Sequence, residues 1–360
     1  MSSYVWKYPV RTVLAVLGLF LVVSCGGGDD NGTGPSDESS WVTTVVSGSV
    51  GPRYNAIALG SDGHPRIAFI DIFTETLGYA RFDGSSWTVE TVPGTAQADE
   101  GAAIVFDSSD HPHIAWQSLG GIRYAYHDGA AWTVEVVENT VVGARNPSVD
   151  IALDASESPA ISFYGGDLFG LKFATRSGVA TWTISTPDAD LYAGFHGTSL
   201  LFDASGDPMI SYYEYSSSAL RMVTWDGSWS MEEVDNSGAV GQYSSMVLDG
   251  TGRPHIAYLD ETNGTVRYAV KEATGWVFQV VGNGYISPSL DLASDGTPWV
   301  AFIEYAGSWV KAAHREGTSW TVESVSEGSG DWRTSLVVGP GDRIHISANL
   351  SSGLGYIHSN

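Results

Sequence analysis

The chain has 360 residues, 43% of them hydrophobic, which is enough to bury a large core and argues against disorder over most of its length. Its net charge is −24 at pH 7, from 41 acidic and 17 basic residues. Because such a surface repels phosphate backbones, the composition argues against DNA or RNA as a partner.

The first 25 residues differ from the rest of the chain. Lys7 and Arg11 precede an apolar run that is shorter than a membrane-spanning helix requires. The run ends at Val22-Val23-Ser24-Cys25, which resembles the lipobox of bacterial lipoproteins. The resemblance implies a lipoprotein signal peptide at 1–25, lipid attachment at Cys25 and a place in the bacterial cell envelope, on a membrane. An incidental thiol is the alternative; no intrachain disulfide is possible with one cysteine.

Residues 26–40 are rich in Gly, Ser and Asp and contain nothing that can pack into a core. We therefore expect a flexible linker at 26–40, followed by one folded domain at 41–360.

From residue 41 onward the chain repeats itself. Each unit opens with a tryptophan, most often within Trp-Thr-Val-Glu, at Trp41, Trp87, Trp132, Trp182, Trp229, Trp276 and Trp320. Three further short apolar runs follow each Trp run, separated by Gly, Asp and Pro. A repeat of this length built from four short strands predicts a β-propeller.

The two ends of the domain complement each other. It begins with a Trp run and ends, at Leu354-Gly355-Tyr356-Ile357, with the fourth run of a unit. Joining the ends completes seven four-stranded blades and removes the unpaired edge of an open ring. The predicted fold is therefore all-β: a seven-bladed β-propeller closed by pairing of the N-terminal strand with the C-terminal blade.

The loops that follow the Trp runs vary most between copies, and propeller topology places them on one rim. Loops on a repeated scaffold are a common place for binding residues. Their aromatic and basic side chains, which we expect to be exposed, are candidates for ligand binding: Arg53, Tyr54, His196, Tyr243, Trp332 and Arg333. Ordinary loop packing is the alternative.

A second pattern joins an acid at the end of the third run to a base in the fourth. The pairs Glu214–Arg221 and Asp260–Arg267 are each seven residues apart. This spacing predicts cross-strand ion pairs in a hairpin. The same groups beside tryptophan could also recognise ligand hydroxyls.

Two acids, Asp150 and Asp291, stand in the second run, where most other copies have small or apolar residues. Facing each other across the channel, they could form the carboxylate pair of a glycoside hydrolase. Alternatively, they satisfy buried backbone amides. We expect no metal site and no cofactor.

Several connections before the Trp run carry Asp and Gly, as in Asp83-Gly84-Ser85-Ser86-Trp87 and Asp226-Gly227-Ser228-Trp229. They resemble the Asp-box hairpin of sialidase-like (BNR-type) propellers, in which this hairpin is structural. Together the patterns favour a monomeric, membrane-anchored, exported propeller that binds a ligand, with carbohydrate the leading class. A sialidase-like glycoside hydrolase or lyase, and an envelope scaffold that binds a protein, are the alternatives.

Overall fold

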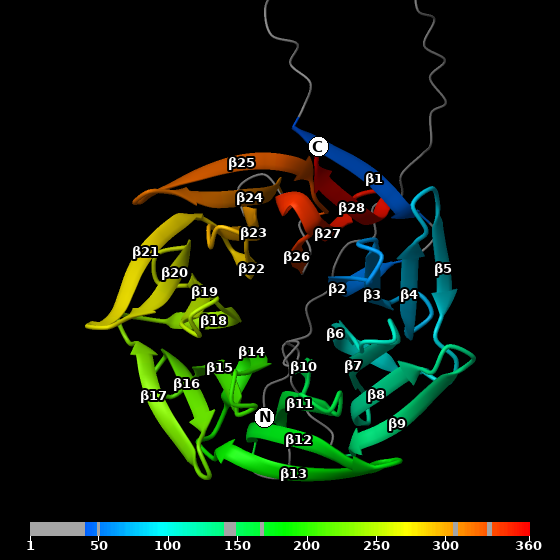
Figure 1. Ribbon diagram of the computed structural model, residues 1–360, viewed down its shortest axis with the longest axis horizontal. Helices are drawn as coiled ribbons and strands as arrows, with labels where there is room; N and C mark the ends of the chain where they lie inside the picture. The colour runs from blue at the N-terminus through cyan, green and yellow to red at the C-terminus, as the bar shows by residue number, and fades with distance from the viewer. Residues whose placement is uncertain (1–39, 49–50, 140–148, 166–168, 305–308, 330–332) are drawn as a thin grey trace, which may run out of the picture. The chain divides into compact units, whose positions relative to one another are not determined.

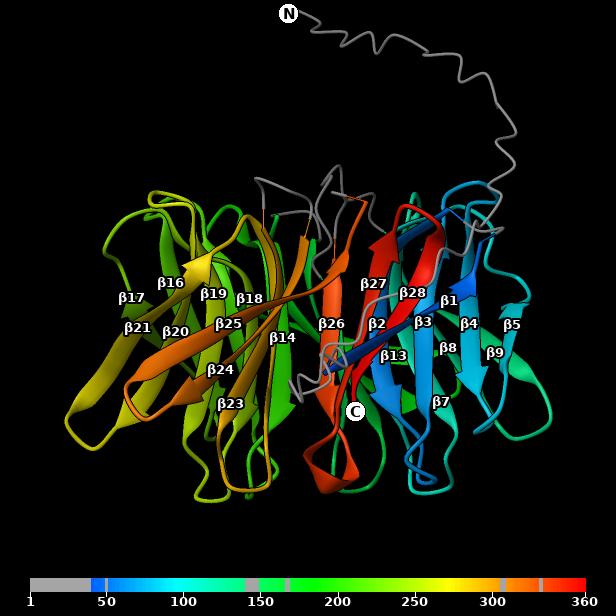
Figure 2. The same ribbon diagram turned by 90° about the horizontal axis from the view of Figure 1, so that it is seen from above.

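The computed structural model describes residues 40–48, 51–139, 149–165, 169–304, 309–329 and 333–360. Contacts separate residues 1–39 from a compact unit at 40–360. In that unit, seven four-stranded antiparallel sheets stand in a ring around a central channel, as Figure 1 shows, with the strands steeply inclined to the ring plane in Figure 2.

Each blade has four strand positions, numbered here from the channel outward. The innermost strands are β2 (Pro52–Leu59), β6 (Ala98–Phe106), β10 (Val149–Leu153), β14 (Ala193–Phe202), β18 (Val240–Leu248), β22 (Ile286–Leu292) and β26 (Thr334–Val338). The second strands are β3 (Pro65–Asp71), β7 (Pro112–Ser118), β11 (Pro159–Gly165), β15 (Pro208–Glu214), β19 (Pro254–Asp260), β23 (Pro298–Glu304) and β27 (Ile344–Leu350). The third strands are β4 (Thr76–Phe82), β8 (Gly121–His127), β12 (Gly170–Gly178), β16 (Ala219–Trp225), β20 (Thr265–Glu272), β24 (Trp309–Glu316) and β28 (Gly353–Ser359). The outermost strands are β5 (Trp87–Thr91), β9 (Trp132–Glu138), β13 (Thr181–Asp188), β17 (Trp229–Asp235), β21 (Gly275–Asn283), β25 (Ser319–Glu327) and β1 (Trp41–Ser47).

Blades are numbered from the innermost strand, so blade 1 contains β2–β5 and blade 7 contains β26–β28 with β1. The closing strand β1 pairs antiparallel with β28, with Trp41 opposite Ser359 and Val45 opposite Gly355. Figure 1 shows β1 along the outside of β28. The predicted seven blades and their closure are thus confirmed.

Turn chemistry sets the limits of the strands. Six of the seven second strands begin with proline, where the missing N–H removes no interior ladder bond. In the hairpin between β4 and β5, Asp83 Oδ1 accepts hydrogen bonds from the amides of Ser85 and Ser86, which fixes the turn. The short 3₁₀ turn η1 (Pro340–Asp342) replaces the simple turn of the other blades between β26 and β27.

The repeated Trp-Thr-Val-Glu block joins neighbouring blades. In five blade interfaces the indole Nε1 donates to the fourth residue of the preceding block at 2.8–3.1 Å: Trp132 to Glu90, Trp182 to Glu135, Trp276 to Glu232, Trp320 to Gln279 and Trp41 to Glu323. We call this bond the tryptophan latch. At the other two interfaces the fourth residue is Thr44 or Ser185, opposite Trp87 and Trp229.

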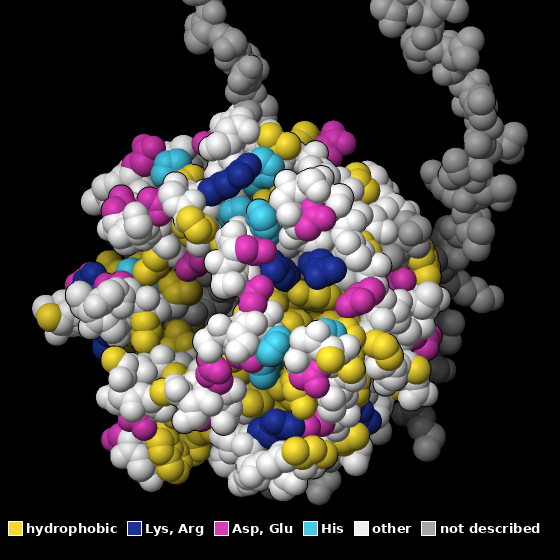
Figure 3. All heavy atoms as spheres, turned by 45° about the vertical axis from the view of Figure 1, so that its right-hand side comes forward, with side chains coloured by type: hydrophobic (Ala, Val, Ile, Leu, Met, Phe, Trp, Pro, Cys, Tyr) yellow, Lys and Arg dark blue, Asp and Glu magenta, His cyan; other side chains and the backbone are white. Residues whose placement is uncertain are grey.

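The surface is mixed in character. On the face drawn in Figure 3, acidic, basic and histidine side chains are interspersed with hydrophobic ones rather than gathered in one patch. Within the part of the chain that the structure describes, no helix is long and apolar enough to cross a membrane.

Candidate functional site

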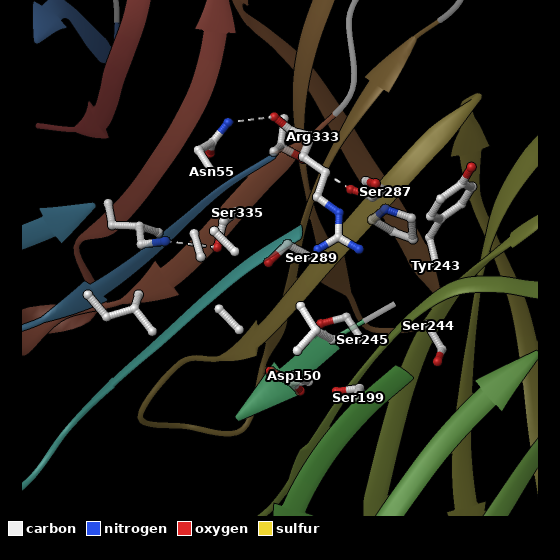
Figure 4. A pocket seen from close by; sticks show the side chains of 18 of the residues that line it. Asn55, Asp150, Ser199, Tyr243, Ser244, Ser245, Ser287, Ser289, Arg333 and Ser335 are labelled. Carbon is white, nitrogen blue, oxygen red and sulfur yellow. Dashed lines mark hydrogen bonds between the residues drawn. The ribbon is translucent and has the colours of Figure 1, made fainter. Parts of the chain in front are cut away.

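A cavity of about 220 Å³ lies in the central channel, between the innermost strands. Polar side chains dominate its lining, which includes Asn55, Asp150, Thr198, Ser199, Tyr243, Ser244, Ser245, Ser287, Ser289, Arg333, Thr334 and Ser335. Figure 4 shows the Arg333 guanidinium pointing into the space between these residues. The cavity therefore combines one cation with many hydroxyl groups.

Some of the hydroxyls hold adjacent blades together. The side chains of Ser199, Ser245, Ser289 and Ser335 each accept a hydrogen bond from a backbone amide of the next innermost strand, at 2.9–3.1 Å. Each of these hydroxyls also has a donor hydrogen and a second lone pair beyond this bond. The same bonds that fix the blades therefore also fix the positions of these cavity-lining oxygens.

Arg333 belongs to a set of equivalent residues at the mouth of this cavity. We define the mouth ring as the residues three positions before the repeated large apolar residue of each innermost strand, which is Ile57, Ile104, Leu200, Met246, Leu290 or Leu336. Its described members are Tyr54, Gly101, Gly197, Tyr243, Ser287 and Arg333. Register shifts occur next to this position in five innermost strands, as β-bulges that redirect side chains.

Arg333 is held through its backbone carbonyl, and its side chain lies among several ionisable groups. The Asn55 side chain donates to the Arg333 carbonyl at 3.1 Å and to Asn349 at 3.1 Å, which ties blade 1 to blade 7. Burial lowers the pKa of the Arg333 guanidinium, against the raising effect of Tyr54, Tyr243 and nearby acids. A guanidinium stays protonated in proteins, so the cavity lining carries a fixed positive charge at Arg333, which is half-buried.

Glu100, one residue before the mouth ring, has an unusual ionisation. Burial and the nearby Asp99 raise the pKa of Glu100 to about 8, although Arg53, a hydrogen bond with Tyr54 and Arg333 oppose the rise. Burial likewise raises the pKa of Tyr54. At neutral pH most Glu100 side chains are therefore protonated, so this carboxyl group adds little negative charge beside Arg333.

Asp150 lines the cavity, but both of its oxygens accept backbone hydrogen bonds, from Ile151 at 2.9 Å and Leu200 at 2.8 Å. Burial raises its pKa to about 6, against those bonds. Asp291 accepts from Leu292 and Val338, each at 2.8 Å, and is not among the cavity-lining residues. The structure therefore places the two candidate carboxylates at different levels of their strands, each bonded to backbone.

An aromatic track leads from Tyr243 of blade 5, at the cavity, across the same rim of blade 4. Its successive ring contacts are Tyr243–His196 at 5.9 Å, His196–Phe195 at 4.6 Å, Phe195–Tyr192 at 5.8 Å and Tyr192–Tyr215 at 5.5 Å. Tyr215 and Tyr192 are 51% and 39% exposed. Burial lowers the pKa of His196, so this ring is neutral at pH 7. The track offers exposed ring surface that is continuous with the cavity.

One expectation about the rim is wrong. Tyr54 is buried, with 2% of its surface exposed, rather than presented to solvent. Its left-handed backbone, with φ of 50°, lies within the register shift of β2, between the paired residues Arg53 and Ala56. Of the other candidates, Arg53, His196, Tyr243 and Arg333 are partly buried, and Trp332 lies outside the described residues, as does Cys25.

The acid–base pairs lie away from the cavity, each across a hairpin of one blade. Arg221 contacts Glu214 at 3.4 Å, and Arg267 contacts Asp260 at 3.8 Å. Glu214 is fully buried and also accepts bonds from the amides of Ser216 and Ser217. Each arginine lies closer to acids at or just beyond the end of the preceding blade's outermost strand: Arg221 to Asp190 at 2.9 Å and Asp188 at 3.3 Å, and Arg267 to Asp235 at 2.9 Å. The cross-strand pairs are therefore the longer contacts of two bridges between blades.

Sequence reasoning missed Glu100 and the serine oxygens of the channel. The copies can be aligned on the large apolar residue that lies three positions after the mouth ring. In that alignment Arg53, Glu100, His196 and Trp332 share one position, and the mouth ring occupies the next. That alignment would have found Glu100. Among the described residues, no group of three or more His, Cys, Asp or Glu side chains is placed to hold a metal ion.

Glu100 makes stability depend on pH. Its pKa rises from 4.5 to about 8 on folding, so the unfolded chain loses this proton first as pH increases. The contribution of this group to stability therefore falls between about pH 4.5 and pH 8, by about 1.4 kcal/mol per pKa unit at most. We expect Glu100→Gln to melt at a higher temperature than the wild type at pH 9 and at an unchanged temperature near pH 5. Thermal melts across this pH range will measure the difference; parallel curves would contradict the buried, protonated state.

Comparisons with known proteins show the fold. No protein-family model matches the chain, and no curated protein matches it by sequence. Among solved structures, the β-propeller domain of Cps50 (Swd1) from Myceliophteria thermophila is similar with TM-score 0.58 and 13% identity, over 86% of this chain and 96% of that one. The structure of YCF48 bound to D1 peptide is similar with TM-score 0.57 and 13% identity, over 90% of this chain and 97% of that one. The fucose-specific lectin from Aleuria aurantia is similar with TM-score 0.54 and 14% identity, over 76% of this chain and 95% of that one. At these identities the likeness establishes a β-propeller fold and no more.

Proposed function

We propose that this protein is a lipid-anchored, exported binding module of the bacterial cell envelope whose channel mouth binds an acidic saccharide. The observation that carries the proposal is the half-buried Arg333, whose guanidinium is directed into a hydroxyl-lined cavity. A guanidinium in a site of low dielectric binds a carboxylate through paired, charge-assisted hydrogen bonds.

The cavity size and the aromatic track favour a sugar acid over a simple anion. A volume of about 220 Å³ equals roughly seven water molecules, which is more than a lone carboxylate fills. The serine and threonine hydroxyls match the hydroxyls of a sugar ring. Further sugar units leaving the cavity meet the track, where Tyr215 and Tyr192 present stacking surfaces. The similarity in fold to a fucose-specific lectin is consistent with this class of ligand.

Substitution of Arg333 tests the site. We expect Arg333→Gln to weaken binding of a glucuronate-terminated oligosaccharide about 100-fold, because a charge-assisted pair in a buried site is lost. Arg333→Lys keeps the charge but not the planar pair of donors, so its affinity should lie between that of the wild type and that of Arg333→Gln. Isothermal titration calorimetry measures all three proteins.

Arg81→Gln is the matched control, since it removes the same charge from an exposed residue near the opposite end of blade 1. Its affinity should equal that of the wild type. Equal affinity of Arg333→Gln and wild type would rule out the channel mouth. A glycan array without signal, together with recovery of a protein partner, would favour an envelope scaffold instead.

The proposed anchor fits the direction in which the chain enters the propeller. Trp41 pairs with Ser359, at the end of β28 away from the β27–β28 hairpin. That hairpin lies on the rim of the channel mouth, so the chain enters at the opposite rim. We expect Cys25→Ala to move the protein from the membrane fraction to the soluble fraction and to remove metabolic labelling by palmitate. Retention of both properties would contradict lipidation at Cys25.

An enzyme acting on the same ligand, a sialidase-like hydrolase or a lyase, is the second candidate. The observation that favours it is Glu100, a carboxylic acid largely protonated at pH 7 beside Tyr54 and Arg333. A protonated acid close to a bound sugar can donate a proton in bond cleavage. Turnover by the wild type that disappears in Glu100→Gln, with ligand binding retained, would establish this function; binding without turnover would exclude it.

A further inference from the structure

A second pocket lies between blades 3 and 4 and shares no lining residue with the channel cavity. Its volume is about 520 Å³. Large apolar side chains make up much of its wall, from β12 of blade 3 and from β14, β16 and β17 of blade 4: Phe173, Phe202, Trp225 and Trp229. Turn residues Asp154 and Asp207 place the pocket toward the rim opposite the channel mouth.

The tryptophan latch is absent at this interface. In five sister interfaces an acid or amide accepts from the indole N–H, but Ser185 stands at the equivalent position opposite Trp229. The Ser185 hydroxyl is directed to the Phe173 carbonyl, at 3.4 Å. No protein acceptor bonds the Trp229 indole within the described chain. With serine rather than glutamate at position 185, the Trp229 indole N–H has no protein acceptor among the described residues, and the shorter side chain leaves space beside the indole.

A second departure from the repeat widens the apolar wall. Trp225 pairs with Trp229 across β16 and β17, and their ring centroids are 5.3 Å apart at 67°. Sister blades carry Phe82, His127 or Arg176 at the position of Trp225. Trp225 is 37% exposed, and Phe173 closes the other side of Trp229 at 5.3 Å. The two inclined indoles thus form a corner that opens to solvent.

Polar groups line the rest of this pocket. The one basic residue of its described lining, Arg176, is paired with an acid. The Arg176 side chain bonds Glu135 through Nε at 3.1 Å and Nη2 at 2.5 Å, so its charge is paired. Thr175, Thr183 and Asp207 supply further hydrogen-bonding atoms. The pocket therefore offers flat aromatic surface, one indole donor and several oxygen atoms, but no unpaired cation among its described residues.

We propose that this pocket binds a neutral pyranose ring. The C–H face of the sugar packs on the indole of Trp225 or Trp229, and a ring hydroxyl accepts the Trp229 N–H that has no protein acceptor. The described lining holds no cation other than Arg176, which is paired with Glu135, so its aromatic walls suit a neutral ring rather than an acid. The protein then has two saccharide sites on opposite rims, one for an acidic and one for a neutral unit.

The chain itself supplies the variant that tests this proposal. Ser185→Glu introduces the residue that sister blades carry, so the latch forms, the interface folds and the acceptor occupies the Trp229 N–H. The probes are the methyl pyranosides of glucose, galactose, mannose and fucose, observed by ¹⁹F NMR of protein labelled with 5-fluorotryptophan. We expect at least one of them to shift the Trp229 signal saturably, and Ser185→Glu to weaken that binding at least tenfold.

Two controls separate this site from the other interfaces and from the channel. Thr44→Glu adds an acid at the other interface that lacks one, and should leave pyranoside binding unchanged. Arg333→Gln should also leave it unchanged, so failure of the acidic-saccharide proposal would not affect this result. The proposal is overturned if none of the four pyranosides shifts the Trp229 signal, or if Ser185→Glu binds them as well as the wild type does.

Discussion

Removal of residues 41–47 is expected to destabilise the propeller by about 4 kcal/mol or more, the scale of losing a whole strand: its ladder with β28, the packing of the partly buried Trp41 and Val46, and a latch. This segment is the closing strand β1. Trp41 packs against the core formed by blades 6 and 7 and donates to Glu323 at 2.8 Å, while Val46 packs against the core between blades 7 and 1. The deletion also exposes the edge of β28, an unpaired strand that can pair with another molecule.

Thermal melting measures this loss directly. For a domain of this size the melting temperature should fall by roughly 10 °C, and the truncated protein should aggregate on heating. The control is deletion of 26–39 alone, which leaves every residue of β1 in place and should melt with the full-length protein. A truncation of 41–47 that melts at the wild-type temperature would contradict closure by β1.

Loss of the Glu135 side chain is expected to cost about 2 kcal/mol, since it leaves the partly buried charge of Arg176 and the partly buried indole donor of Trp182 without their acceptor. Glu135 is 3% exposed and accepts from Trp182 Nε1 at 3.1 Å and from two nitrogens of Arg176. Glu135→Ala removes all three bonds. Glu135→Gln keeps an acceptor for Trp182, as Gln279 does for Trp320, but loses the charge pair, so its cost should be intermediate.

Chemical denaturation of the variants measures the free energy of unfolding. The matched control is Thr44→Ala, at the equivalent position of β1, where the side chain is exposed; its effect should stay within about 0.5 kcal/mol. A double-mutant cycle with Trp182→Phe isolates the latch itself. If Glu135→Ala and Thr44→Ala destabilise equally, the latch does not hold the blades together.

The fold could be predicted because it depends on features that repeat. The tryptophans, the prolines that begin six second strands and the complementary chain ends each report local chemistry that is the same in every blade. The latch was harder to recognise, because the bond joins the Trp of one copy to the Glu of the preceding copy. Within one block the two residues appear as parts of a single strand.

The candidate site could be predicted only in part. Tyr243 and Arg333 stand out because they interrupt the repeat, and both line the channel cavity. The burial of Tyr54 and the ionisation of Glu100 depend on bulges and on how deep the mouth ring lies in the channel, which strand patterns do not report. For Asp150 the sequence left two alternatives, a catalytic carboxylate and an acceptor for backbone amides, and the structure shows both of its oxygens bonded to backbone amides.

The most direct test of the proposed function compares two ligands that differ at one group. Titration calorimetry of the wild-type protein with a glucuronate-terminated disaccharide, and with the same disaccharide reduced from carboxylate to alcohol, isolates the contribution of Arg333. We expect saturable binding of the acid, stronger at pH 6.5 than at pH 8.5 because Glu100 is protonated at the lower pH, and at least tenfold weaker binding of the alcohol. Equal binding of the two disaccharides, or binding of the alcohol alone, would contradict a carboxylate site at the channel mouth.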